Sequence, residues 1–191
     1  MSITRYATIT ACRLICFVLV LMGGCKAQRT PLVQAAIDND TARVRQILDS
    51  GVGVSEPDVT GTTALHYAAY NNNVDMARVL IEAGAKVDFL DRSRMTPLLI
   101  AIHECHTEMM SVLLDAGASL GPIQGQKSTP LHYAVQWGQA AAAKVLLERG
   151  ADVNALSDAG RTPMDIAFPI GNQQLIDLLI QHGGHILKTR L

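Results

Sequence analysis

The stretch Ser128-Thr129-Pro130-Leu131-His132-Tyr133-Ala134 decides the fold, because near copies of it recur along the chain at a constant spacing. Each copy begins with Thr, followed by Pro or Ala and then by Leu or Met, and successive copies start 33 residues apart: Thr30, Thr63, Thr96, Thr129 and Thr162. A glycine follows each of these threonines by 21 positions: Gly51, Gly84, Gly117, Gly150 and Gly183. Self-similarity at a period between about 20 and 50 residues indicates stacked structural repeats.

Each period has the pattern of two helices followed by a projecting turn. Thr is a favourable N-cap and Pro a favourable first helical residue, so the first helix of each repeat is expected to begin at the motif. The same Ala recurs at one inward position of all five first helices, which indicates a narrow space between neighbouring repeats. Each first helix is expected to end in a tight left-handed turn, mostly at Asn or Gly: Asn39, Asn72, Cys105, Gly138 and Gly171.

The 33-residue period with its T-P-L-H-x-A core resembles the ankyrin repeat. The resemblance covers about residues 28 to 185 and implies an all-α solenoid of five stacked helix-turn-helix repeats with short β-hairpin-like turns. It places the repeat domain at residues 30–185 and a tail at 186–191. In this family the motif His bridges Thr and the backbone of the next repeat, so His66 and His132 are expected to be structural. The fold alone does not fix function, because ankyrin repeats bind many unrelated partners.

The composition favours a binding protein over an enzyme or a nucleic-acid binder. The 191 residues are 17% charged, with a formal net charge of −1. Both charges before Cys25 are basic, so the rest has 14 basic and 17 acidic groups, a net charge of −3 that disfavours nucleic acid. The sequence lacks nucleophile-elbow, zinc-protease and phosphate-loop motifs, so neither catalysis nor a cofactor is expected. We expect a monomer that binds a protein partner.

The first 25 residues resemble the signal of a bacterial lipoprotein. Arg5 and Arg13 precede the apolar run Leu14 to Met22, whose nine residues fall well short of the ~20 that span a bilayer. Gly23-Gly24-Cys25 resembles a lipobox, which predicts a signal peptide at 1–24, a lipidated Cys25 and a tether at 25–29. Lys26 in place of Asp favours the periplasmic face of the outer membrane in that family. An ordinary secretory signal with a free Cys25, an uncleaved anchor and a misassigned N-terminus remain alternatives.

The partner site is predicted from the positions at which the repeats differ. Ankyrin proteins usually bind through the turn tips and the face of the first helices. Arg94 and Lys127 stand where repeats two and five have Gly61 and Gly160, so they should reshape their tips and add positive charge. Trp137 is the only Trp, and aromatic residues and Arg are enriched in binding hot spots. The predicted site contains seven residues, whose alternative interpretation is ordinary surface: Tyr70, Arg92, Arg94, Met95, His103, Lys127 and Trp137.

A second hypothesis is a redox-responsive or metal-responsive protein that acts through Cys105 with His103 and His106. Three potential ligands within four residues lack an obvious fourth, so the sequence predicts no metal site, and an ordinary surface turn is the simpler interpretation. A third hypothesis is an effector that acts on host proteins, as ankyrin proteins of intracellular bacteria do, although the signal-like segment disfavours it. Among periplasmic functions, support of an envelope enzyme and immunity against a toxin both fit.

Overall fold

The computed structural model describes residues 29–186, in which the chain forms ten helices and no β-strand. The first helices of the five repeats are α2 (Pro31–Ile37), α4 (Ala64–Tyr70), α6 (Pro97–His103), α8 (Pro130–Gln136) and α10 (Pro163–Ile170). The second helices are α3 (Thr41–Asp49), α5 (Val74–Glu82), α7 (Thr107–Asp115), α9 (Ala140–Glu148) and α11 (Gln173–Gln181). The predicted all-α solenoid of five repeats is therefore confirmed.

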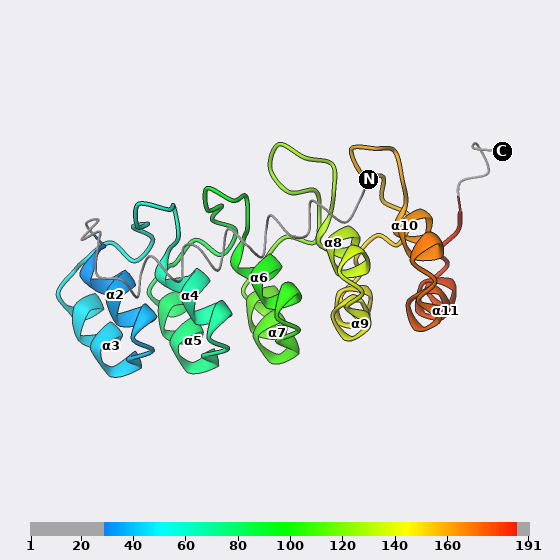
Figure 1. Ribbon diagram of the computed structural model, residues 1–191. Coiled ribbons are helices and arrows are strands. Elements are labelled where there is room, and N and C mark those ends of the chain that lie inside the picture. The colour runs from blue at the N-terminus through cyan, green and yellow to red at the C-terminus, as the bar shows by residue number, and fades with distance from the viewer. Residues whose placement is uncertain (1–28, 187–191) are drawn as a thin grey trace.

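Helix pairs stand side by side in a row, and the connections between repeats project beyond the first helices on one side (Figure 1). The predicted signal peptide, Cys25 and most of the tether lie outside the described residues, as does the tail from 187 onward. Within residues 29–186, no helix is both long enough and apolar enough to span a bilayer.

The start of each first helix follows from its Thr. Thr30, Thr96 and Thr162 each accept a hydrogen bond at Oγ1 from the backbone N–H three residues later, at 3.2 Å. This bond satisfies one of the N–H groups that a helix N-terminus leaves without a partner. Pro occupies the first helical position in four of the five, as the motif predicted.

The left-handed turns between the paired helices are also where the sequence places them. Gly138 and Gly171 have φ of 72° and 71°, whereas the three non-glycine residues at this position have φ between 52° and 59°: Asn39, Asn72 and Cys105. Asn tolerates this conformation because its short polar side chain forms local hydrogen bonds, but Cys has no such compensation. Cys105 is therefore held in a strained backbone conformation by the repeat around it.

The core is continuous through all five repeats. Its narrowest positions are the five equivalent alanines, each 0% exposed, as the sequence predicted: Ala35, Ala68, Ala101, Ala134 and Ala167. First helices of adjacent repeats contact each other directly at this level. Interiors are close-packed, so a larger side chain at these positions would force neighbouring helices apart.

The motif histidines connect neighbouring repeats. In repeat four, His132 Nδ1 accepts from Thr129 N at 3.1 Å, and its Nε2 lies 3.0 Å from the Arg161 carbonyl of repeat five. Because an amide N–H can only donate and a carbonyl can only accept, Nδ1 must be unprotonated and Nε2 must carry the proton. His66 makes the same contacts with Thr63 N and the Met95 carbonyl.

Burial lowers the pKa of both motif histidines below the ordinary value of 6.5, which keeps the imidazoles neutral. Their structural role is thus confirmed.

Candidate functional site

The projecting turns have one common design in repeats two, three and five. The first residue of each turn donates its N–H to the carbonyl four residues later, as Asp58 does to Thr62 at 2.9 Å and Asp91 to Met95 at 3.0 Å. The side chain of that first residue, Asp in repeats two and three and Ser in repeat five, then accepts from the backbone at the far side of the turn, as Asp91 Oδ1 does from Met95 N at 2.8 Å and Ser157 Oγ does from Arg161 N at 3.2 Å. These tips are therefore rigid single turns rather than loose loops.

Arg94 does not reshape its tip, contrary to the sequence prediction. Its φ is 61°, close to the 77° of Gly61 and the 63° of Gly160 at the same position. The turn therefore has the same backbone conformation in these three repeats. The bonds from the Asp91 carboxylate and backbone over-determine the turn and hold Arg94 in a conformation that L-residues otherwise avoid.

The tip of repeat four does differ, as the loss of glycine at Lys127 predicted. Here the closing bond runs from Ile123 N to the Ser128 carbonyl at 3.1 Å, five residues on instead of four. The left-handed position moves back to Gly125, with φ of 75°. The turn is thus one residue longer, and the segment before it is one residue shorter, since the period stays at 33.

Adjacent tips are bonded to one another. Arg92 N donates to the Thr60 carbonyl of the preceding tip at 3.0 Å, and Lys127 N donates to Asp158 Oδ1 of the following tip at 2.9 Å. The bond from Lys127 N is the main cause that lowers the pKa of Asp158. Arg94 Nη2 donates a hydrogen bond to the Gln124 carbonyl, so part of its guanidinium is bonded to the next tip. The tips thus form a connected row, from which the side chains of Arg92 and Lys127 project exposed.

An aromatic strip crosses repeats three and four along the first helices. It consists of His103, Tyr133 and Trp137. The rings of His103 and Trp137 meet edge to face with centroids 5.1 Å apart, and Trp137 lies 5.3 Å from the Tyr133 ring. The Tyr133 hydroxyl donates to Gln126 Oε1 at 2.5 Å, which ties the strip to the tip of repeat four. Burial raises the pKa of Tyr133, so this hydroxyl stays protonated as a donor.

The structure brings some of the seven predicted residues together and separates others. His103 and Trp137 are in contact, and Arg94 touches the same tip that carries Lys127. Tyr70, 43% exposed, lies one repeat before His103 at the equivalent helix position. Met95 is half-buried and packs against the core, so it offers less surface than the sequence suggested.

Tyr133 and Gln126 were not among the seven predicted residues. Tyr133 stands four residues before Trp137, and side chains at that spacing meet on one face of a helix, so the signal for it was present. Gln126 becomes a partner of Tyr133 only because the fourth tip is lengthened, which no spacing in the sequence reveals.

The cluster around Cys105 does not converge on a common point. His103 Nδ1 lies 2.8 Å from the carboxylate of Glu104, whereas His106 Nδ1 lies 3.1 Å from the Ala69 carbonyl of the preceding repeat. No three His, Cys, Asp or Glu side chains among residues 29–186 come together as a metal site. His106 instead connects repeat three to repeat two. Gln139, at the equivalent position of repeat four, likewise donates to the His103 carbonyl of repeat three. Cys105 itself is a free, exposed thiol.

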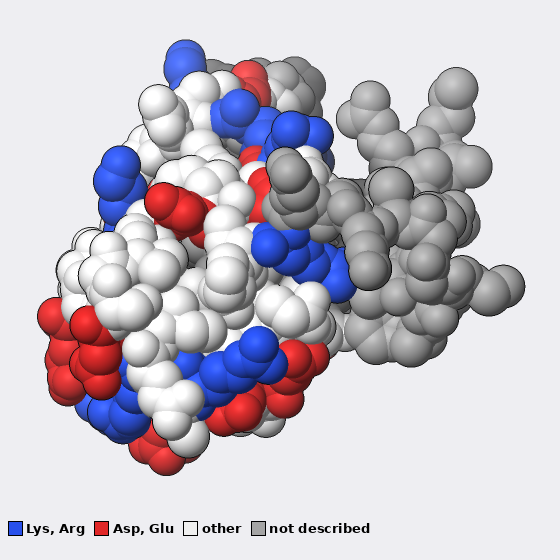
Figure 2. Space-filling model, turned by 90° about the vertical axis from the view of Figure 1, so that its left-hand side faces the viewer, with Lys and Arg blue, Asp and Glu red and all other residues white. Residues whose placement is uncertain are grey.

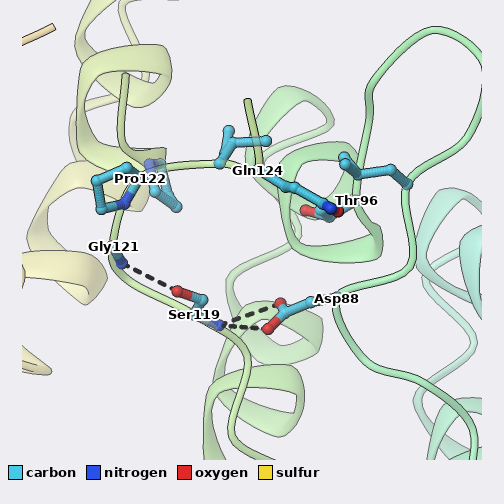
Figure 3. A pocket seen from close by; sticks show the side chains of 9 residues that line it. Asp88, Thr96, Ser119, Gly121, Pro122 and Gln124 are labelled. Atoms are coloured by element: carbon cyan, nitrogen blue, oxygen red, sulfur yellow. Dashed lines mark hydrogen bonds between the residues drawn. The ribbon is translucent and has the colours of Figure 1, made fainter. Parts of the chain in front are cut away.

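A small pocket lies between the tips of repeats three and four (Figure 3). Its volume is about 240 Å³, and its walls include Leu90, Pro122 and Pro130. The Asp88 carboxylate in its wall accepts from Ser119 N at 3.1 and 3.3 Å. The volume is below the range of roughly 300–1,000 Å³ typical of small-molecule sites, and this carboxylate is already paired. We therefore regard it as a gap between two packed turns and not as a small-molecule site.

A family model described as "Ankyrin repeats (3 copies)" matches residues 7–91, 84–157 and 129–190. The chain belongs to the ankyrin repeat family. The first of these matches begins inside residues 1–24, the predicted signal peptide. The signal peptide itself stays a prediction. A search among curated proteins finds no match. Ankyrin repeats generally mediate protein–protein interaction and are typically not enzymes, which supports a non-catalytic binding module.

Proposed function

We propose that this ankyrin protein is a non-catalytic binder whose protein partner docks across the tips and first helices of repeats three and four. The observation that carries the proposal is the aromatic strip, in which His103 and Tyr133 hold the single Trp of the chain at a partly exposed position. A large ring that is already immobilised loses little conformational freedom on binding, and aromatic residues dominate binding hot spots.

The charges beside the strip indicate what the partner should present. Arg92, Arg94 and Lys127 project from two neighbouring tips, on a body whose net charge after Cys25 is −3. Such a local excess of positive charge steers an acidic surface into place and suppresses incorrect orientations. The partner is therefore proposed to bring carboxylates to the tips and an apolar or aromatic group to Trp137. Tyr70 and Met95 lie at the margin of this contact.

The proposal is tested by capture of proteins from envelope extract with matched variants. Trp137→Ala and Lys127→Glu should lose a protein that the unmodified chain retains. Glu108→Ala, at an exposed position on α7, should retain it. Circular dichroism confirms that each variant is folded. Lys127 is exposed, so a loss of capture by Lys127→Glu cannot be attributed to disturbed packing at Trp137. Equal retention by all folded variants would contradict the assignment of the strip and tips.

We further propose that the protein is secreted to the bacterial periplasm and held at the inner face of the outer membrane by lipid on Cys25. The support is the signal-like sequence before Cys25, which lies outside the described residues. The four-residue link to Thr30 reaches at most about 18 Å when extended, which would keep the first repeat near the lipid surface. Palmitate labelling that disappears in Cys25→Ser supports this location, and labelling that persists in Cys25→Ser contradicts it.

Within that location, the binder would support an envelope enzyme or neutralise a toxin. Both functions need a rigid binding surface and no catalysis, so the strip fits either. The gene beside this one distinguishes them, because an immunity protein normally lies next to its toxin. Captured partners of the unmodified chain that match that neighbouring gene product favour immunity.

A further inference from the structure

The fourth tip is connected to Trp137 through the side chain of Tyr133. The Tyr133 hydroxyl donates to Gln126 Oε1 at 2.5 Å, and the Tyr133 ring lies 5.3 Å from the Trp137 ring, tilted by 45°. Tyr133 stands four residues before Trp137, a spacing at which side chains meet on one face of a helix. One hydrogen bond and one ring contact therefore link the tip to the indole.

Repeat two has the same tyrosine but a different acceptor. Tyr67, at the position of Tyr133, donates to Asp58 Oδ2 at 3.1 Å, and Asp58 is the first residue of its turn. In repeat four the acceptor instead lies three residues into the turn, whose closing bond starts at Ile123. The residues aligned with Gln126 in the other three tips have shorter side chains: Thr60, Ser93 and Ala159. The lengthened tip thus supplies its own acceptor for the tyrosine.

The backbone on both sides of Gln126 is bonded to a neighbouring tip. From the preceding tip, Arg94 Nη2 donates to the Gln124 carbonyl. On the other side, Lys127 N donates to Asp158 Oδ1 of the following tip at 2.9 Å. The acceptor of the tyrosine hydroxyl is therefore fixed in place by repeats three and five, and does not move with a loose loop.

An amide suits this position because it carries no charge. Figure 2 looks along the solenoid from its first repeat, with Lys and Arg side chains predominant at the upper side, where the tips project in Figure 1, and both signs mixed among the helices below. In repeat two, whose tip contains no Lys or Arg, the carboxylate of Asp58 accepts from the tyrosine. In repeat four the amide of Gln126 accepts without placing an anion beside Lys127.

We infer that Gln126 is a positioning residue for Trp137: its amide oxygen fixes the Tyr133 ring, and that ring fixes the indole in the orientation that a partner meets. The His103 ring also contacts the indole, edge to face at 5.1 Å, so one of the two rings that orient Trp137 depends on Gln126.

The benefit for binding is a smaller loss of conformational freedom. A side chain that is mobile before binding must be immobilised by the partner, which weakens affinity by about two- to tenfold. Gln126→Ala should therefore weaken the binding of a captured partner by about that factor, without removing any group that the partner touches at Trp137. This consequence rests on the proposed function, whereas the positioning of Trp137 does not.

The positioning is tested by the fluorescence of the purified full-length chain, without a partner. Trp137 is the only Trp, so acrylamide quenching and fluorescence anisotropy report this side chain alone. Gln126→Ala and Tyr133→Phe should each raise the quenching constant and lower the anisotropy. The double variant should show no further change, because both substitutions break the same bond. Gln126→Glu retains an acceptor oxygen and should keep the values of the unmodified chain.

Tyr67→Phe is the matched control. It removes the equivalent hydroxyl and its bond to Asp58 in repeat two, where Asn71 stands at the position of Trp137. It should lower the urea midpoint about as much as Tyr133→Phe does, but leave the quenching and anisotropy of Trp137 unchanged. A purely structural bond in repeat four would make the two tyrosine variants alike in both measurements.

Three outcomes would overturn the inference: unchanged quenching in Gln126→Ala, an equal rise in Tyr67→Phe, or a rise in Gln126→Glu as large as in Gln126→Ala. The failure of the proposed function looks different. Partner capture that survives Trp137→Ala, together with increased quenching in Gln126→Ala, would contradict the proposed function and support the positioning of Trp137. Capture that is lost in Trp137→Ala, together with unchanged quenching in Gln126→Ala, would do the reverse.

Discussion

Replacement of His132 by Phe isolates the contribution of one inter-repeat bridge. Phe keeps most of the ring volume, so the packing around this 2%-exposed site changes little. The substitution removes the acceptor for Thr129 N and the donor for the Arg161 carbonyl. Thr129 is itself 4% exposed, so water cannot easily reach the abandoned N–H. The damage is therefore electrostatic and confined to the junction of repeats four and five.

The expected loss follows from the two hydrogen bonds. A buried donor left without a partner costs about 1–3 kcal/mol, and the lost bond to the carbonyl adds about 1 kcal/mol, so the free energy of unfolding should fall by about 2–4 kcal/mol. Whole domains are stable by about 5–15 kcal/mol, so this is a large fraction. The matched control is His182→Phe at an exposed position, which should change stability by less than about 0.5 kcal/mol.

The pH dependence gives a second, independent signature. The folded-state pKa values of His66 and His132 lie below 6.5 because both rings are buried, so their stabilisation is complete above pH 6.5. As the pH falls below 6.5, the unfolded chain binds protons that the folded chain excludes, and stability decreases. Each histidine contributes a slope of up to about 1.4 kcal/mol per pH unit until its lowered folded-state pKa is reached. His132→Phe should remove the contribution of His132 and so roughly halve the slope that His66 and His132 contribute together.

Urea unfolding measures both quantities. Trp137 is the only Trp and lies in repeat four, so its fluorescence reports the junction directly, while circular dichroism reports all helices. The two probes must coincide for a single free energy to apply, because repeat arrays can unfold in parts. A loss below about 0.5 kcal/mol, or an unchanged dependence between pH 6.5 and pH 5, would refute the bridge as described.

Three further predictions test the backbone strain, the packing and the tip geometry. Cys105→Gly should raise the urea midpoint, because an L-residue in the left-handed conformation costs about 1–2 kcal/mol and Gly escapes most of that cost. Ala134→Leu should lower stability by about 1–3 kcal/mol through overpacking, whereas Ala141→Leu at an exposed position should leave the midpoint nearly unchanged. Arg94→Gly should keep the turn and weaken partner capture. The urea midpoint should stay the same or rise, because relief of the left-handed backbone is opposed by loss of the bond to the Gln124 carbonyl. A large loss of stability there would contradict the geometry.

The sequence specifies the repeats well because it samples each structural position five times. The Thr caps, the buried alanines and the left-handed turns recur at one spacing, so a coincidence at one repeat is corrected by the other four. The same redundancy assigned His66 and His132 to scaffold, which their contacts confirm.

The tips and the aromatic strip are harder to predict from the sequence than the repeats are. The fourth tip gains a residue while the preceding segment loses one, so the constant period hides the change. The contact of Trp137 with His103 depends on side-chain direction across two helices. The alignment of repeats also gives no warning that Phe168 is 61% exposed, since the equivalent residues of the earlier repeats are all buried.

Arg94 shows why a substitution between repeats cannot be interpreted from residue type alone. Its replacement of glycine suggested a different turn, but the Asp91 carboxylate and the closing backbone bond keep the turn unchanged. The cost of the left-handed backbone therefore falls on Arg94 itself, at about 1–2 kcal/mol. Gly would avoid that cost, so the benefit of Arg must come from its side chain. That side chain spans to the Gln124 carbonyl and places a positive charge between two tips, beside the strip that carries Trp137. Strain retained at an exposed position, where packing does not require it, supports a role for Arg94 in binding.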